Sequence, residues 1–189
     1  MARQSKAEKQ KSHARILEAA AQVFREKGIE ATSLADVMTA AGLTHGGFYR
    51  HFASKEALVA AAFHHAVGQA VGDMEKAQTP EERAAARAAY LARYLSAKHL
   101  ASPEAGCPLA ALGAEMAREP GAARDAAGEA VHRVAALLDD AGLGEPPSDT
   151  PRNGYARLAL LLGTITLARL ADSEADQILQ AGQEALAQL

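Results

Sequence analysis

Helix start signals recur along this chain, and apolar residues follow each of them at helical spacing. The clearest is Thr79-Pro80-Glu81-Glu82, in which Thr is the N-cap, Pro takes the first helical position and the second Glu completes a capping box. Further start signals are Thr32-Ser33, Thr44, Ser54, Thr150-Pro151, and Ser173 with Asp176. We therefore expect this chain to pack helix against helix.

The composition supports an all-α fold because residues that favour strands are scarce. The 189 residues include four Tyr, four Phe and no Trp, whereas Ala, Leu, Glu, Arg and Gln are abundant. The apolar spacing predicts helices over residues 8–27, 34–40, 44–51, 54–75, 79–100, 108–118, 120–140, 150–171 and 173–187.

Several classes of protein are disfavoured by the same sequence. The most apolar stretch, Leu158–Ala168, has about half of the roughly 20 residues that a membrane-spanning helix needs. The N-terminus is polar and basic, unlike a secretory signal. The single cysteine, Cys107, rules out an internal disulfide and a paired-cysteine metal site, and the His residues are scattered. We expect a cytoplasmic protein without a metal or cofactor.

Charge is distributed unevenly along the chain. Residues 1–55 hold nine Lys or Arg against five Asp or Glu, so they carry a net charge of +4, whereas the whole chain carries −3. A basic N-terminal part on an acidic remainder suits a protein that presents one end to a polyanion. A solvated basic tail would explain the same numbers.

Residues 33–52, SLADVMTAAGLTHGGFYRHF, have the layout of a helix-turn-helix motif. In such a motif the second helix must fit a major groove about 12 Å wide. Phe48 and Phe52 are four residues apart and can pack inward together. Gly46 and Gly47 each weaken a helix by about 1 kcal/mol relative to Ala, which suggests close approach of another molecule. The alternative is a glycine-rich turn before a core helix.

Residues 16–58, ILEAAAQVFREKGIEATSLADVMTAAGLTHGGFYRHFASKEAL, resemble the TetR/AcrR family of transcriptional regulators. The resemblance implies about nine helices, with a DNA-binding domain at residues 1–53 and a ligand-binding and dimerisation domain at 54–189. It also implies a homodimer that binds a palindromic double-stranded DNA operator, usually as a repressor, and that a small-molecule effector releases.

The resemblance assigns DNA contacts to particular positions. Thr32 and Ser33 match phosphate contacts, and Lys55 matches a phosphate-contacting lysine. Position 45 is often Lys or Arg in relatives, so His45 is a departure. Arg50 is added because a guanidinium there could reach base edges. The positions that match family residues on or beside DNA are Thr44, His45, Gly46, Gly47, Tyr49 and His51. A basic arm, from Arg3 to Arg15, is either a further DNA contact or a solvated tail.

The body of the chain suggests two further sites. The helix expected over residues 150–171 is apolar nearly all round and must be buried on most faces. A four-helix dimer interface explains this better than a core within one chain. Its expected residues are Leu158, Leu161, Ile165, Ile178 and Leu186. Candidate effector contacts, each of which could equally be ordinary packing, are Tyr90, Tyr94, Cys107, Met116 and His132.

Cys107 admits two interpretations. It precedes Pro108 at an expected helix start, where a helix dipole can lower the pKa of a thiol, and some members of the resembling family sense oxidants or electrophiles near such a position. A lone cysteine is otherwise a small buried hydrophobe.

An enzyme and a structural adaptor are the rival functional classes. Catalysis would need a nucleophile–base pair, a metal cluster or a phosphate loop, and the sequence shows a motif for none of them. An adaptor would not need the segment from Thr44 to His51. The operator, the regulated genes, the effector and the choice between repression and activation are left open by the sequence.

Overall fold

The computed structural model describes residues 6–139 and 152–189, and its regular elements in these two stretches are all helical, which confirms the all-α prediction. The expectations for Arg3 and for Thr150-Pro151 fall outside the described residues. The α-helices are α1 (Lys6–Lys27), α2 (Leu34–Ala40), α3 (Lys55–Lys76), α4 (Pro80–Tyr94), α5 (Ala97–Ala101), α6 (Pro108–Met116), α7 (Gly121–Leu138), α8 (Arg152–Leu170) and α9 (Ala175–Leu186). Short 3-10 helices are η1 (His45–Arg50), η2 (Pro103–Ala105) and η3 (Asp172–Glu174).

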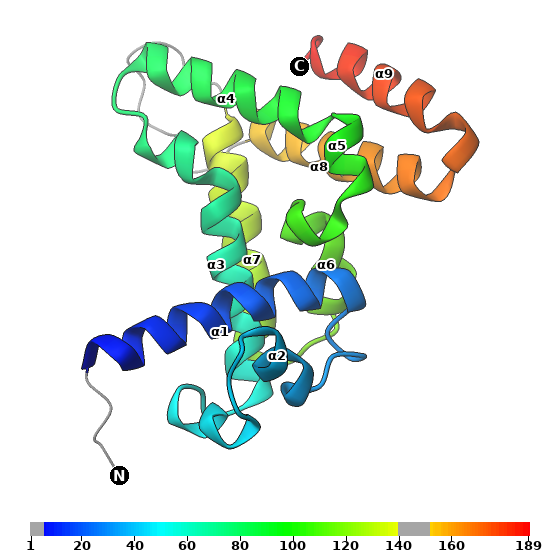
Figure 1. Ribbon diagram of the computed structural model, residues 1–189. Coiled ribbons are helices and arrows are strands. Elements are labelled where there is room, and N and C mark those ends of the chain that lie inside the picture. The colour runs from blue at the N-terminus through cyan, green and yellow to red at the C-terminus, as the bar shows by residue number, and fades with distance from the viewer. Residues whose placement is uncertain (1–5, 140–151) are drawn as a thin grey trace.

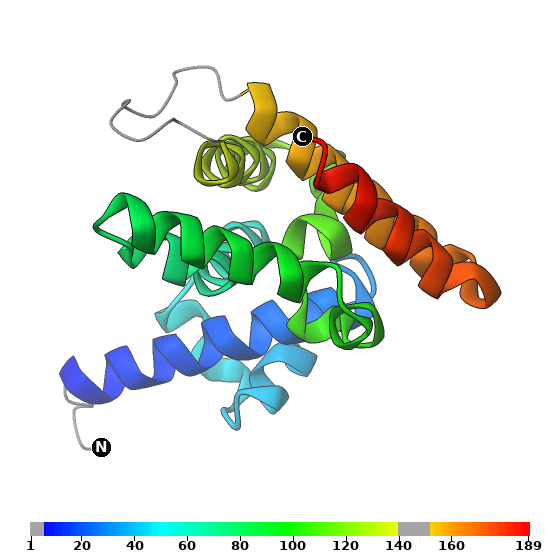
Figure 2. The same ribbon diagram turned by 90° about the horizontal axis from the view of Figure 1, so that it is seen from above.

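The elements α1, α2 and η1, called the head from here on, lie together at one end of the molecule, whereas α4, α8 and α9 lie at the other (Figure 1). The long helices α3 and α7 run side by side between the two ends (Figures 1 and 2). The last two helices, α8 and α9, pack against each other along the side opposite the head (Figure 2). None of the described helices is long and apolar enough to cross a membrane.

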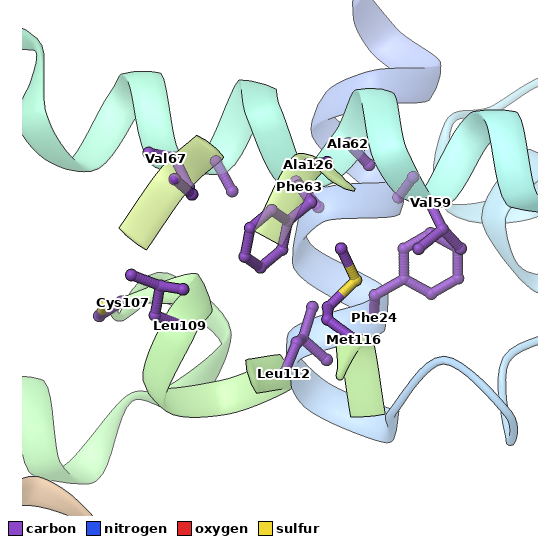
Figure 3. Close-up of a cluster of buried hydrophobic side chains, with 14 of the residues drawn as sticks. Phe24, Val59, Ala62, Phe63, Val67, Cys107, Leu109, Leu112, Met116 and Ala126 are labelled. Atoms are coloured by element: carbon purple, nitrogen blue, oxygen red, sulfur yellow. The ribbon is translucent and has the colours of Figure 1, made fainter. Parts of the chain in front are cut away.

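One continuous core joins the head to the rest of the chain, called the body from here on. Phe24 of α1 lies beside Met116 of α6 and Val59 of α3, and Phe63 and Leu112 extend the cluster (Figure 3). Phe24 and Met116 are at most 2% exposed. Because these side chains come from both parts, the orientation of the head depends on packing against α6 and α3.

Glycines allow α8 to approach its two neighbours closely. A Cβ at Gly154 would lie 2.7 Å from the carbonyl carbon of Ala135 on α7. A Cβ at Gly182 on α9 would lie 2.5 Å from the hydroxyl oxygen of Thr164. Both distances are too short for real atoms, so these positions require glycine for the observed spacing of the helices.

Most expected helix boundaries are close to the observed ones, and the capping box at Thr79 is confirmed. Thr79 Oγ1 accepts a hydrogen bond from the Glu82 amide at 3.1 Å, and the Glu82 carboxylate accepts one from the Thr79 amide at 3.1 Å. The Glu82 carboxylate also accepts a hydrogen bond from the backbone amide of Gln78. The bond from Gln78, followed by that from Thr79, lowers the pKa of Glu82.

Three local expectations were wrong. The helix expected over residues 79–100 ends at Tyr94, because the Ser96 hydroxyl accepts from the His99 amide and starts the separate helix α5. Ser173 and Asp176 do not cap α9, which follows η3 without a side-chain cap. Thr44 precedes η1, yet its side chain makes no capping hydrogen bond.

Candidate DNA-binding interface and effector cavity

The turn between α2 and η1 is anchored to α1. Val37 and Met38 of α2 are at most 1% exposed, so α2 is fixed against the core. Gly42 has φ +64°, a conformation that favours glycine, and its carbonyl accepts a hydrogen bond from Arg15 at 3.3 Å. The position and direction of the following segment are therefore fixed by the core and by one α1 guanidinium.

The segment η1 buries one face and exposes the other. Phe48 and Phe52 are 0% and 7% exposed, and their ring centroids are 5.9 Å apart, which confirms that they pack inward together. Tyr49 between them is 69% exposed. No atom of the described residues lies within 4 Å of a Cβ built at Gly46. Around Tyr49, the segment thus presents bare backbone and exposed polar side chains, as a groove-reading element would need. The exposed polar side chains include Thr44, His45 and Arg50.

The position of Thr32 does not fit the phosphate contact expected for its side chain. Its side chain is 1% exposed, and its hydroxyl donates to the carbonyl of Gly28 at 2.6 Å. Thr32 thus stabilises the turn between α1 and α2, and its hydroxyl does not reach the surface.

Ser33 is exposed, but it is committed to a capping box at the start of α2. Its hydroxyl donates to the Asp36 carboxylate at 2.6 Å, and these bonds from Ser33 lower the pKa of Asp36. A carboxylate therefore already occupies the positive end of α2. A phosphate at Ser33 would have to approach beside this negative charge.

Lys55 begins α3 on the same end of the molecule as η1 (Figure 1). The helix start is capped by Ser54, whose hydroxyl accepts from the Ala57 amide at 3.1 Å. Lys55 is partly exposed. A cation beside the N-terminus of a 22-residue helix combines two features that attract phosphate, namely its own charge and the helix dipole.

A basic groove runs between α1 and the end of η1. It is lined by Lys6, Lys9, His13, Arg50 and His51, among others. The His13 ring stacks on Phe52 with centroids 4.7 Å apart and lies 5.9 Å from the His51 ring. Burial, followed by the neighbouring His13, Lys9 and Arg50, lowers the pKa of His51. The groove extends the positive surface of the head from η1 to the N-terminal turns of α1.

A cavity of about 250 Å³ lies in the body, between α3, α4, α5, η2 and the start of α6. Three expected effector contacts, Tyr90, Tyr94 and Cys107, line it. The other two do not. Met116 is 0% exposed in the core that joins the head to the body, and His132 is exposed on α7, where its ring is 3.1 Å from the Tyr155 hydroxyl.

His99 organises one wall of this cavity. Its Nδ1 is 2.7 Å from the Tyr94 carbonyl oxygen, so Nδ1 carries a proton and donates. Its Nε2 then accepts from the Cys107 amide at 2.9 Å. This pair of bonds requires a neutral ring. Burial, the largest cause, lowers the pKa of His99 and favours the same state.

Of the two interpretations of Cys107, its environment favours the buried thiol. The side chain is 6% exposed, and its burial raises the pKa of the thiol. The Tyr94 hydroxyl and the first amides of α6 act in the opposite direction without overcoming burial. At neutral pH Cys107 is therefore held as a protonated thiol.

The expected dimer residues are mostly inside the chain's own core. Leu158, Leu161 and Ile165 are at most 3% exposed, because this face of α8 packs on α7 and α6. They are not available to a partner. Ile178 and Leu186 are half-buried. Large apolar side chains that are exposed on α8 include Leu167 at 56% and Leu170 at 78%.

Hydrogen bonds between the body and the head were not predicted from the sequence. Glu115 of α6 accepts from the amides of Ile29 at 2.7 Å and Glu30 at 3.4 Å, in the turn between α1 and α2. Arg25 of α1 donates to the Gly106 carbonyl at 3.4 Å. Because these pairs are 81 to 86 residues apart in sequence, no local pattern indicates them.

Comparison with known proteins agrees with this architecture. Residues 16–62 match the family model described as bacterial regulatory proteins, tetR family. The HTH-type transcriptional regulator TtgR of Pseudomonas putida is 44% identical over 61 residues, which are 32% of this chain and 29% of that protein. The match thus spans less than a third of this curated relative.

Two solved structures cover nearly the whole chain. A TetR-family transcriptional regulator from Cytophaga hutchinsonii is 26% identical with a TM-score of 0.70, over 100% of this chain and 98% of the other. A TetR transcriptional regulator from Chloroflexus aurantiacus is 25% identical with a TM-score of 0.72, over 96% and 95%. Residues 16–62 thus match the tetR family of bacterial regulatory proteins, and the chain as a whole shares the fold of solved TetR-family transcriptional regulators.

Proposed function

We propose that this protein is a ligand-responsive repressor that acts in the cytoplasm and binds a palindromic operator in double-stranded DNA as a homodimer. Residues 1–53 would bind DNA, and residues 54–189 would bind the effector and the partner subunit. The observation that carries the proposal is the reading segment, residues 44–51. Its Tyr49 is 69% exposed, whereas the neighbouring Phe48 is fully buried.

The reading segment would enter the major groove, with base or groove contacts from His45, Gly46, Gly47, Tyr49 and Arg50. Lys55, at the start of α3, and His51, beside the basic groove, would contact phosphates on either side. Such contacts position the protein, whereas base contacts give sequence preference. In a homodimer, two reading segments would lie about 34–36 Å apart, one turn of the duplex.

Dimerisation is proposed through the outward faces of α8 and α9. Leu167 and Leu170 are the most exposed large apolar residues of α8, and Leu189, just after α9, is 47% exposed. A two-fold arrangement would bury these side chains against the same surface of a second subunit. The half-buried Ile178 and Leu186 would lie at the margin of this interface.

Release of DNA would follow when an effector fills the cavity beside Tyr90, Tyr94 and Cys107. A ligand shifts the protein toward release only if it binds better to a body conformation that misplaces the heads. A coupling of about 1–3 kcal/mol would change operator affinity roughly 5- to 150-fold. The protonated, buried Cys107 thiol favours packing against the effector over reaction with electrophiles. Equal release of wild type and Cys107→Ser by an electrophile would support this choice.

The test is selection of binding sites from a pool of random DNA duplexes, followed by gel-shift titration. The selected sites should be palindromic, and Tyr49→Ala and Lys55→Ala should each weaken binding. Lys76→Ala is the matched control, because Lys76 is an exposed lysine at the opposite end of α3. Loss of binding in the control, or wild-type binding by both variants, would contradict the assignment. A reporter gene behind the selected site distinguishes repression from activation.

A further inference from the structure

Two tyrosines that line the effector cavity carry buried hydroxyl groups that have no oxygen or nitrogen partners among the described residues. Tyr90 and Tyr94 lie one helical turn apart on α4, with ring centroids 5.7 Å apart, and are 4% and 3% exposed. Neither hydroxyl has a hydrogen-bond partner among the nitrogen and oxygen atoms of the described residues. The Tyr94 hydroxyl lies against the Cys107 thiol, which is a weak partner.

Both hydroxyls are available as donors. Burial raises the pKa of Tyr90 and of Tyr94 well above that of a free tyrosine, so both keep their protons at neutral pH. A buried donor without an acceptor is unfavourable, and an acceptor supplied by a ligand removes that cost. Two donors one turn apart suit the two oxygens of a single carboxylate.

The charges around the cavity favour the same ligand. The described residues that line it include Arg93 and Lys98 but no Asp or Glu. The Arg93 guanidinium lies 5.6 Å from the centre of the Tyr90 ring, while its Nη2 donates to the Ala70 carbonyl at 2.9 Å. Behind the lining, Arg169 acts electrostatically on both Tyr94 and Cys107. Glu104 also acts on Arg169 and partly offsets this positive charge.

The size and remaining walls of the cavity limit the rest of the ligand. Its volume of about 250 Å³ is below the roughly 300–1,000 Å³ typical of sites for drug-sized molecules. Ala70, Ala105 and the two tyrosines give the lining an apolar part beside its polar residues. A single ring or a short branched chain would fit such a space, and one negative charge would balance the surrounding cations.

We propose that the effector is a small apolar monocarboxylic acid whose carboxylate accepts hydrogen bonds from the hydroxyls of Tyr90 and Tyr94. The role of the acid as effector rests on the proposed function, whereas binding of the acid is a property of the free protein. The body of the acid packs on the apolar part of the wall, and Arg93 and Lys98 place positive charge in the lining.

The test is isothermal titration calorimetry of the full chain, without DNA, with benzoate and phenylacetate, and with benzamide and phenylacetamide as their neutral analogues. At least one acid should bind, and its neutral analogue should bind tenfold or more weakly. Tyr90→Phe and Tyr94→Phe should each weaken acid binding about tenfold or more, as expected for loss of a hydrogen bond to a charged group. Tyr155→Phe, which removes a hydroxyl outside the cavity, should leave it unchanged.

Thermal unfolding of each variant shows whether it is folded. The phenylalanine variants should be at least as stable as wild type, because the lost hydroxyls have no oxygen or nitrogen partners among the described residues. Absence of binding by both acids, equal binding of acid and neutral analogue, or wild-type affinity in both phenylalanine variants would overturn the proposal. A gel shift on the same samples separates the two questions. Protein that binds DNA but neither acid would refute the carboxylate while leaving the proposed repressor intact.

Discussion

Replacing Glu115 with Ala tests whether the body holds the head through this one side chain. The carboxylate accepts from the Ile29 amide at 2.7 Å, and Ile29 is only 3% exposed. Glu115→Ala would leave this amide without its acceptor in a place where water has little access. The expected loss in free energy of unfolding is about 1–3 kcal/mol. Glu115→Gln keeps an acceptor oxygen and should lose about 1 kcal/mol, the difference between a charged and a neutral acceptor.

Urea denaturation followed by circular dichroism measures this loss. Glu119→Ala is the control, because it removes the same charge near the same end of α6, and we expect a change within about 0.5 kcal/mol. Glu115→Ala should also weaken DNA binding, since the turn that it leaves unsupported leads into α2. If Glu115→Ala and Glu119→Ala are equally stable, the carboxylate does not anchor the head, and the account of how body and head are joined is wrong.

The remaining predictions concern packing, assembly, pH and salt. Gly154→Ala should lower the free energy of unfolding by about 1–3 kcal/mol through overpacking against α7, whereas Gly128→Ala, in open space on α7, should raise it by about 0.5–1 kcal/mol in the same urea titrations. Leu167→Glu should give folded monomers in analytical ultracentrifugation. If the variant dimerises at the same protein concentration as wild type, the interface lies elsewhere. The lowered pKa of His99 means that its stabilising effect is present above its unfolded value of about 6.5 and is lost as pH falls through the folded value. Wild type should thus lose more stability than His99→Gln between neutral and mildly acidic pH, and parallel curves would exclude this role. Lys55→Ala should make the slope of log K against log salt concentration about one unit shallower, and an unchanged slope would exclude a phosphate contact.

Local signals in the sequence were sufficient for most of the helices and for the inward packing of Phe48 and Phe52. Capping residues act within one turn, so the start of α4 at Pro80 could be predicted from Thr79 and Glu82 alone. The inward pairing of Phe48 and Phe52 follows from their spacing of four residues. The break after Tyr94 was missed because Ser96 sits inside a continuous apolar pattern, and only the structure shows that its hydroxyl caps a new helix.

The body sites were harder to predict because they depend on contacts between distant segments. An apolar helix such as α8 can be buried by its own chain or by a partner, and the sequence does not distinguish the two. The structure places Leu161 and Ile165 in the core and Leu167 outside. His99 joins the end of α4 to the start of α6, and Glu115 reaches the turn at Ile29. Neither role has a signature in the neighbouring residues.

Directed cleavage of DNA reports whether residues 44–51 lie in the major groove, as proposed. An iron chelate attached to His45→Cys, in a Cys107→Ser background, should cut a selected palindrome in two patches about one helical turn apart. The same chelate on Gln78→Cys, in the turn between α3 and α4 at the opposite end of the molecule, is the control (Figure 1). Two patches from position 45 and none from position 78 are the predicted result. Binding without cleavage from position 45, or equal cleavage from both positions, would exclude the placement of residues 44–51 in the groove.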